Sequence, residues 1–357
     1  MLELLDSLFR FAAVGAGVLG IAVILRAERR TVVHGLAAAF LCSVAAYLVL
    51  SAPAAAALPG TVRLALLALA TVGAAMLWLT SRALFVDGFR LARLDLAPVV
   101  LLAAFGLFSY ATRGQNGPWT GAAGSAHNVA AAALYLHAVW CAWTGYRADL
   151  IEARRRFRLL FVCTTSAVGL AIIVAEVALR GQAVPAELEL LKVATIAILS
   201  VALLAWAFEL RIDWLAGRES PPQEEMPAGE RQLLAALLDT MDRDRVYREP
   251  GLTIAALAVR LKASESLLRR LINRRLGHRN FNTFLNERRI RETAQALSDP
   301  ARARLPVLSI ALDSGFASIG PFNRAFKEAL GTTPTEFRRQ KLSAAKTDPE
   351  ARPKADI

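Results

Sequence analysis

Seven long apolar runs, separated by short polar loops, fill roughly the first 210 residues and constrain the fold of this chain more than any other feature. Each run is close to the ~20 residues that a helix needs to cross the hydrocarbon core of a bilayer. Soluble helices are seldom this long and this uniformly apolar. The sequence therefore predicts an all-α fold that begins with seven transmembrane helices, at Leu8–Leu25, Val32–Leu50, Val62–Thr80, Ala97–Thr112, Ala126–Gly145, Leu159–Leu179 and Leu190–Phe208.

The composition indicates that two parts of the chain meet different environments. Hydrophobic residues make up 55% of the sequence and the mean hydropathy is +0.40, yet the formal net charge is +12. One part is expected to contact membrane lipids, and the other a polyanion or an anionic membrane surface.

Arginines are concentrated in alternate loops, which predicts the orientation in the membrane. The loops that follow the first, third, fifth and seventh runs are rich in arginine, whereas the loops between them are poor in it. The positive-inside rule places the arginine-rich loops in the cytoplasm. The N-terminus is then outside and the C-terminus inside. The arginines are Arg26, Arg29 and Arg30, then Arg82, Arg90 and Arg93, then Arg147, Arg154, Arg155, Arg156 and Arg158, and finally Arg211 and Arg218.

The composition changes sharply after Trp214, which predicts the domain boundaries. Residues 1–215 form the transmembrane domain, and the proline-, glycine- and acid-rich stretch 216–230 is a linker. Residues 231–341 have the helical periodicity of a soluble domain, beginning with a helix at Arg231–Tyr247. Residues 342–357 are predicted to be a disordered tail.

A pair of short helices with a tight connection follows that first soluble helix. Ile254–Leu261 and Glu265–Leu276 are predicted helices, with Thr253 and Ser264 as their N-caps. The three-residue connection is typical of a helix-turn-helix. On the second helix, one face is apolar and the opposite face is polar and cationic, which suits a DNA major groove. The polar face consists of Ser266, Arg269, Arg270 and Asn273.

The same pattern recurs after a long predicted helix at Phe281–Leu297. Leu308–Asp313 and Ile319–Leu330 are the second pair, with Ser318 as N-cap and Gly331 as the stop. Phe322, Phe326 and Leu330 form its predicted buried stripe, and Asn323, Arg324 and Lys327 lie off that stripe. A last short helix begins at Pro334.

The second pair lies in a run that resembles the signature of the AraC/XylS family of transcription regulators. The run has Gly315-Phe316, Ser318, Phe322-Asn323-Arg324-Ala325-Phe326-Lys327, Gly331, Pro334 and Phe337-Arg338. The resemblance covers about Leu252–Arg339, and the upstream half is similar to membrane-anchored members with several spans. It implies two helix-turn-helix units joined by one long helix, with reading helices in successive turns of the major groove of promoter DNA.

The resemblance also implies which residues contact double-stranded DNA. The base-reading positions of the family fall at Ser266, Arg269 and Arg270 on the first reading helix, and at Ile319, Gly320, Asn323 and Arg324 on the second. Arginine recognises guanine and asparagine recognises adenine through paired hydrogen bonds, whereas isoleucine offers only apolar contact. Gly320 departs from the polar residue often found there. We therefore expect the first unit to dominate recognition. The helix N-termini at Thr253, Ser264 and Ser318 can hold phosphates.

Structural interpretations of the same residues remain open. Arg270 and Arg324 are alternatively solvated charges or partners in internal salt bridges. Lys327 is alternatively structural or a phosphate contact. Asn273 shares the polar face but is not among the family's base-reading positions.

Three ionisable residues in the apolar runs are candidates for a sensing site in the membrane. His137 falls near the middle of the fifth run, and His127 and Glu176 fall near the outer ends of the fifth and sixth. Intramembrane ionisable residues are costly and often functional. The alternative is that His137 hydrogen-bonds a neighbouring helix and that His127 and Glu176 lie among headgroups.

The sequence indicates a regulator rather than an enzyme. It has no nucleophile–base pair, no phosphate-binding glycine loop and no metal-ligand spacing, so no cofactor and no metal are expected. The prediction is a DNA-binding regulator in the inner membrane of a bacterium, in contact with lipids; an unidentified small ligand and a homodimer are further partner hypotheses. Two alternatives remain: a transporter or membrane enzyme with an appended regulatory domain, and a C-terminal domain that contacts a protein instead of DNA.

Overall fold

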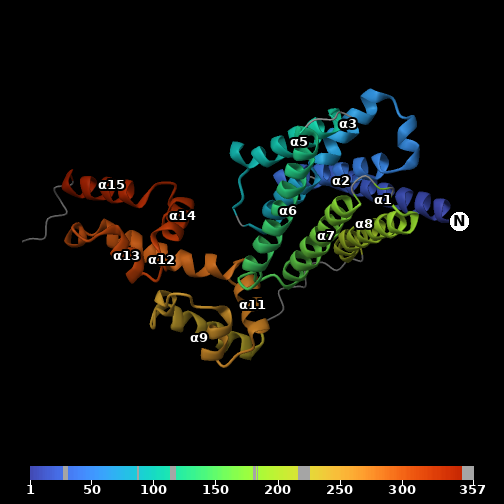
Figure 1. Ribbon diagram of the computed structural model, residues 1–357. Helices are drawn as coiled ribbons and strands as arrows, with labels where there is room; N and C mark the ends of the chain where they lie inside the picture. Colours follow the sequence, from blue (N-terminus) through green and yellow to red (C-terminus); the bar gives the residue numbers. More distant parts are fainter. Residues whose placement is uncertain are drawn as a thin grey trace, which may run out of the picture. The chain divides into compact units, whose positions relative to one another are not determined.

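The computed structural model describes residues 1–26, 31–86, 88–112, 118–179, 182, 184–215 and 226–347 (Figure 1). The described secondary structure is helical, apart from an isolated β-bridge between Asp149 and Asn280. The prediction of an all-helical chain is confirmed. The chain divides into two compact units, which we call the N-terminal unit (Met1–Tyr146 and Ala153–Pro222) and the C-terminal unit (Arg147–Glu152 and Gln223–Ile357). Most of the predicted linker, residues 216–225, lies outside the described residues.

The N-terminal unit is a bundle of long apolar helices, and each of the seven apolar runs corresponds to a helix or, for the third run, to two helices. The helices are α1 (Leu2–Leu25), α2 (Val32–Leu50), α3 (Gly60–Thr71), α4 (Gly73–Phe85), α5 (Ala97–Ala111), α6 (Pro118–Tyr146), α7 (Glu152–Ala178) and α8 (Ala186–Leu215), with 3-10 turns η1 (Pro53–Ala57) and η2 (Arg93–Leu96).

The third run is the one whose shape the sequence did not predict. It is broken at Val72 into α3 and α4, which are bent by 44°. By length and composition, five stretches of the described residues could each cross a membrane, and the bent pair makes a sixth. α6 is not among them, so the predicted number of seven spans is not established by this criterion.

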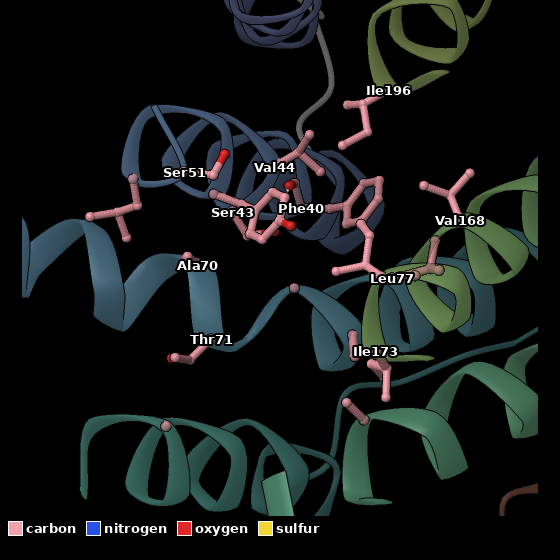
Figure 2. Close-up of a pocket in the computed structure, with 18 of the residues that line it drawn as sticks. Phe40, Ser43, Val44, Ser51, Ala70, Thr71, Leu77, Val168, Ile173 and Ile196 are labelled. Atoms are coloured by element: carbon pink, nitrogen blue, oxygen red, sulfur yellow. Dashed lines mark hydrogen bonds between the residues drawn. The ribbon is translucent and has the colours of Figure 1, made fainter. Parts of the chain in front are cut away.

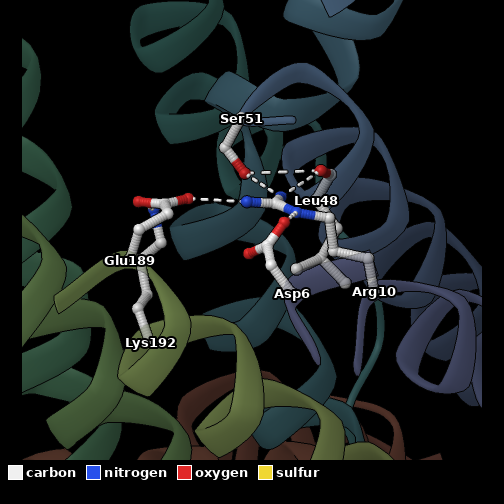
Figure 3. A network of polar contacts seen from close by, with 6 residues as sticks. All are labelled: Asp6, Arg10, Leu48, Ser51, Glu189 and Lys192. Atoms are coloured by element: carbon white, nitrogen blue, oxygen red, sulfur yellow. Dashed lines mark hydrogen bonds and ion pairs between the residues drawn. The ribbon is translucent and has the colours of Figure 1, made fainter. Parts of the chain in front are cut away.

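A buried arginine ties three helices of the bundle together (Figure 3). Arg10 on α1 donates to the side chain of Asp6, to two groups at the C-terminal end of α2 and to one group on α8, at distances of 2.6–2.7 Å. The guanidinium is thereby paired with two carboxylates, which offsets the cost of burying a charge inside an apolar bundle. α1 packs along both α2 and α8. The acceptors are Asp6 Oδ2, Leu48 O, Ser51 Oγ and Glu189 Oε1.

The C-terminal unit contains nine described helical segments. They are α9 (Ala228–Asp242), η3 (Val246–Arg248), α10 (Ile254–Arg260), α11 (Glu265–Arg274), α12 (Phe281–Ser298), η4 (Pro300–Arg302), α13 (Val307–Asp313), α14 (Ile319–Leu330) and α15 (Pro334–Thr347). α14 has the predicted bounds. α9 ends at Asp242 rather than Tyr247, because Arg245 adopts a left-handed conformation with φ of 51°. α15 continues to Thr347, so the predicted tail begins as helix; residues 348–357 lie outside the described residues.

Two hydrophobic cores lie at the two ends of α12. Phe284 and Leu285 belong to the first core, together with residues of α9, α10 and α11. Ile290 and Leu297 belong to the second core, with residues of α13 and α14. α12 is therefore the element that joins the two helix pairs. In the second core, four rings pack at centroid distances of 5.1–5.4 Å, and these belong to Phe316, Phe322, Phe326 and Phe337.

A buried arginine on α12 fixes the connection between α9 and α10. Arg289 Nε donates to Tyr247 O at 2.6 Å, and its Nη2 donates to Glu249 O at 3.1 Å. Burial lowers the pKa of the Arg289 guanidinium. The backbone of the adjacent Arg248 lies against Gly315, where a Cβ atom would be only 2.6 Å from Arg248 Cα. The connection between α9 and α10 is thus bonded to Arg289 of α12 and also packed against Gly315.

Candidate nucleic-acid interface and cavity of the N-terminal unit

α10 and α11 form the first helix-turn-helix unit. Thr253 Oγ1 accepts a hydrogen bond from Ala256 N at 3.2 Å, and Ser264 Oγ accepts one from Leu267 N at 3.3 Å, so both predicted N-caps are formed. The turn between the helices has Lys262 in the left-handed region, with φ of 50°.

Two of the four polar residues predicted on α11 are exposed. Ser266 and Arg270 face solvent. Arg270 Nη2 is 3.7 Å from Glu230 Oε1, but its side chain is 52% exposed, so the ion pair is loose. Asn273 is half-buried, and its Nδ2 donates to His278 O at 2.9 Å, where it closes the turn between α11 and α12. An amide used in this way is less available to a base edge.

Arg269 does not lie on the exposed face, and this corrects the sequence analysis. Only 6% of its side-chain surface is exposed. Nε donates to Glu265 Oε1 at 3.0 Å, and Nη2 donates to Arg147 O at 2.9 Å. Nη1 donates to Asp149 O. Helical periodicity could not reveal this, because the covering groups come from a segment about 120 residues earlier in the chain.

α13 and α14 form the second unit, and α14 presents an exposed polar face. Asn323, Arg324 and Lys327 are exposed, and Ile319 is 38% exposed. Gly320 is half-buried. Phe322 and Phe326 are fully buried, as predicted for the apolar stripe. Leu330, assigned to the same stripe, is 40% exposed because it lies in the last turn of the helix.

The N-terminus of α14 is not capped as the sequence predicted. Ser318 is the N-cap residue, but its side chain accepts no hydrogen bond from the first turn of the helix. Its backbone is fully extended, with φ of −164°. The first-turn N–H groups of α14 therefore have no side-chain cap, which leaves them available to an anion such as a DNA phosphate.

Two consecutive helix-turn-helix units, each with an exposed cationic residue on its second helix, define a DNA-binding domain. Residues 257–340 match the family model described as a helix-turn-helix domain, of the AraC type. The C-terminal unit therefore carries an AraC-type DNA-binding domain, which belongs to a regulatory and not an enzymatic family. No curated protein and no solved structure matches the chain.

The N-terminal unit contains a cavity of about 1170 Å³ (Figure 2). Phe40, Leu77 and Val168 are among its apolar lining residues. Of the three predicted sensing residues, His127 and Glu176 line this cavity. His127 Nδ1 lies 3.1 Å from Leu102 O.

His137 is not among the residues that line the cavity, so the three predicted sensing residues do not form one site. Trp78 Nε1 donates to His137 Nδ1 at 2.7 Å, which agrees with the alternative that His137 bonds a neighbouring helix. Further polar residues that the sequence did not indicate also line the cavity, among them Tyr47, Arg63, Asn128 and Tyr135. The one available signal was Arg63, a cation at the start of the third run.

Proposed function

We propose that this protein is a membrane-tethered transcription regulator, in which a bundle of transmembrane helices carries a cytoplasmic AraC-type DNA-binding domain. The observation that supports it most strongly is the match of residues 257–340 to an AraC-type DNA-binding domain, whose second reading helix exposes Asn323, Arg324 and Lys327. The N-terminal bundle supplies the membrane part of the proposal.

The surface of the N-terminal bundle supports contact with lipid. Large apolar side chains on several helices are more than 60% exposed, which is unfavourable in water over so wide an area. In a bilayer the same side chains meet hydrocarbon. They include Phe11 on α1, Val100 on α5, Val129 and Trp140 on α6, Leu160 and Val174 on α7, and Leu191 and Ile198 on α8.

We infer that α6 also crosses the membrane, which brings the number of spans to seven. It has 29 residues and no Asp, Glu, Lys or Arg. At 1.5 Å per residue it is about 44 Å long, more than the ~30 Å hydrocarbon core. α6 packs against α4 and α5 in the bundle. Its many small residues lower its hydropathy without adding charge. Seven spans, with α3 and α4 counted as one, put the two termini on opposite sides.

The buried arginine network is consistent with that topology. Arg10 lies near the start of α1, Ser51 directly follows α2, and Glu189 lies near the start of α8. In the seven-span topology all three positions are at the outer side of the membrane, and in the structure they meet. The C-terminus of α8 and the DNA-binding domain are then cytoplasmic.

The DNA contacts are proposed from exposure and chemistry. Ser266 and Arg270 on α11, and Ile319, Gly320, Asn323 and Arg324 on α14, contact base edges. Lys327 contacts phosphate, as do the N-termini of the two reading helices at Ser264 and Ser318. Phosphate neutralisation makes such binding strongly salt-dependent.

The cavity is the proposed sensing site. Its apolar lining with a few polar groups suits a small amphipathic ligand, and its volume is close to that of large ligand pockets. His127 and Glu176 are the proposed polar contacts. A homodimer, which would place two domains on one operator, belongs to the same proposal.

Topology and DNA binding are tested separately. A reporter that is active only outside the cytoplasm should be silent when fused after Trp214 and active when fused at Gly121; the reverse pattern overturns the proposal.

Chromatin immunoprecipitation of the tagged full-length protein from its native cells should recover discrete promoter fragments. The matched control is the Arg270→Ala, Arg324→Ala double variant, which should be inserted equally well but recover none of them.

A transporter with an appended regulatory domain is the second candidate, because the break between α3 and α4 and the adjoining cavity are features of transporters. The two functions differ in whether the bound ligand is carried across the membrane. A sensor binds a ligand of the cavity without carrying it across sealed vesicles, whereas a transporter accumulates it.

A further inference from the structure

The loop between α6 and α7 is built into the DNA-binding domain. Arg147–Glu152 groups with the C-terminal unit, although the chain on either side of it belongs to the N-terminal unit. We call this six-residue segment the arm. From the sequence, this segment is expected only to be part of a cytoplasmic arginine-rich loop.

The arm pairs with the backbone of the C-terminal unit. Leu150 N donates to Arg279 O at 3.0 Å, and Phe281 N donates to Ala148 O at 2.8 Å. These two bonds flank Asp149 and Asn280, which therefore form a non-hydrogen-bonded antiparallel pair. The pairing extends the segment that joins α11 to α12.

The arm also contributes a side chain to the first core. Leu150 is only 3% exposed and belongs to the cluster that contains Leu268, Phe281 and Phe284. A leucine in this position is removed from water as completely as the residues of the domain itself. Leu150 is therefore part of the hydrophobic core of this unit and does not merely touch its surface.

The same arm engages the guanidinium of Arg269 on the first reading helix. Carbonyl oxygens of Arg147 and Asp149 accept from its two Nη atoms, and Glu265 accepts from Nε. With its three nitrogens bonded within the protein and its side chain only 6% exposed, Arg269 is not accessible to a base edge while the arm is docked. Its neighbour Arg270 remains exposed.

We propose that the arm is an autoinhibitory docking segment, which withholds Arg269 from DNA while it is seated on the C-terminal unit. The inference rests on the proposed function, because it assumes that α11 reads DNA. The arm is continuous with α6 and α7, so a displacement of the cytoplasmic ends of these helices pulls it from its site. Release frees a second arginine on α11, beside Arg270, and raises the affinity for the operator. In this way the position of α6 and α7 determines whether Arg269 on the reading helix α11 is available to DNA.

Docking is tested first, without DNA. Non-hydrogen-bonded pairs have Cα atoms about 4.5 Å apart, which is within the range of a disulfide. We design the Asp149→Cys, Asn280→Cys pair in full-length protein whose Cys42, Cys141 and Cys163 are replaced by Ser. In native membranes this pair should oxidise to an intramolecular disulfide that a reductant reverses. Arg147→Cys with Asn280→Cys is the mismatched control. Absence of the matched disulfide overturns the proposal.

The effect on DNA is tested with variants of Leu150 in full-length protein reconstituted in nanodiscs. The probe is a duplex selected from a random library by the Leu150→Asp protein, so that its sequence includes the base contacted by the released Arg269. Leu150→Asp places a charge in an apolar site and should release the arm, whereas Leu150→Met conserves volume and should leave it docked. We expect Leu150→Asp to bind this duplex about 5- to 150-fold more tightly, the range for one arginine–guanine contact.

Two further measurements make the result specific to Arg269. Adding Arg269→Ala to Leu150→Asp should abolish the gain. Adding the oxidised Asp149→Cys, Asn280→Cys pair, which locks the arm in place, should abolish it as well. Equal or weaker binding by Leu150→Asp relative to Leu150→Met overturns the autoinhibitory role. If no variant binds any duplex, the proposed function fails, autoinhibition fails with it, and the disulfide result alone decides whether the arm docks.

Discussion

The two helix-turn-helix units follow the same backbone plan but differ at the equivalent residue of the turn. In the first unit the turn residue with positive φ is Lys262, and in the second it is Gly315. A Cβ atom at Gly315 would lie 2.6 Å from the backbone of Arg248, whereas Lys262 is exposed. The first turn therefore requires only the left-handed conformation. The second turn also requires that no Cβ atom be present, because the Arg248 backbone occupies that position.

The two helix-turn-helix units also differ in how many of the predicted DNA-contact residues are exposed on each reading helix. On α11, Arg269 is buried and Asn273 is bonded to His278, so Ser266 and Arg270 are the exposed members of the predicted set. On α14, Asn323, Arg324 and Lys327 are all exposed. In the structure with the arm docked, α14 therefore exposes more of its predicted DNA-contact residues than α11 does, and the dominance of the first unit in recognition stays a prediction.

The largest expected effect concerns the turn of the second unit. Gly315→Ala should destabilise the C-terminal unit by roughly 2–5 kcal/mol, because φ of 94° is strained for alanine and the new Cβ overlaps the Arg248 backbone. Gly315→Asn separates the two causes, since asparagine tolerates positive φ but not the overlap. Hydrogen exchange of full-length protein should show lost protection in α13 and α14 for both. Near-normal protection in Gly315→Asn would contradict the packing argument.

A smaller effect is expected from the exposed arginines. Arg324→Ala on α14 and Arg270→Ala on α11 should each cost ~1–3 kcal/mol at the selected operator and less on scrambled DNA, because a base contact is specific. Ile319→Ala should cost less, since only apolar contact is lost. Titrations at two salt concentrations decide: equal weakening on both DNAs indicates a phosphate contact instead. If Ile319→Ala is the most damaging, base reading by these arginines is wrong.

The sequence predicted those features that depend on local pattern. Helix periodicity was sufficient for α10 to α14, because the apolar positions that define these helices, such as Leu268 and Phe322, pack within the C-terminal unit. The polar face of α14 followed for the same reason. Long apolar runs likewise predicted the helices of the N-terminal bundle.

The features that the sequence did not predict depend on contacts between distant segments. Arg158 was assigned to a cytoplasmic loop, but it is 1% exposed and donates to Phe85 O at 2.7 Å, at the end of α4. Arg269 is covered by the arm in the same way. A long arginine can turn back to carbonyl groups of a neighbouring segment, and nothing in its local pattern distinguishes it from a solvated one.

A further prediction uses the pH to perturb the first unit alone. Desolvation lowers the pKa of His278, the nearby Arg288 lowers it too, and Glu287 opposes both. The unfolded chain then binds a proton more readily than the folded domain. The stabilisation from neutral His278 is present above about pH 6.5 and is lost as the pH falls through the lower folded-state pKa.

The expected result is a modest loss of protection in α11 and α12 at about pH 5.5 relative to about pH 7.5, after correction for intrinsic exchange rates. α13 and α14, which lack a histidine, are the internal control. His278→Gln should remove the difference between the two pairs. A loss that persists in this variant would assign the pH dependence to other groups.

The smallest effect tests the turn of the first unit. Lys262 has φ of 50°, which costs a non-glycine residue roughly 1–2 kcal/mol. Lys262→Gly relieves that strain but increases the freedom of the unfolded chain, which costs about 0.4–1 kcal/mol. The net result should be a stabilisation of at most ~1 kcal/mol, read as slower exchange in α10 and α11. Lys262→Asn removes the same charge and keeps a side chain, so any change in DNA affinity shared by both variants reports the charge. If Lys262→Gly is as damaging as Gly315→Ala, the two turns are constrained alike, and the difference attributed here to the Arg248 backbone is wrong.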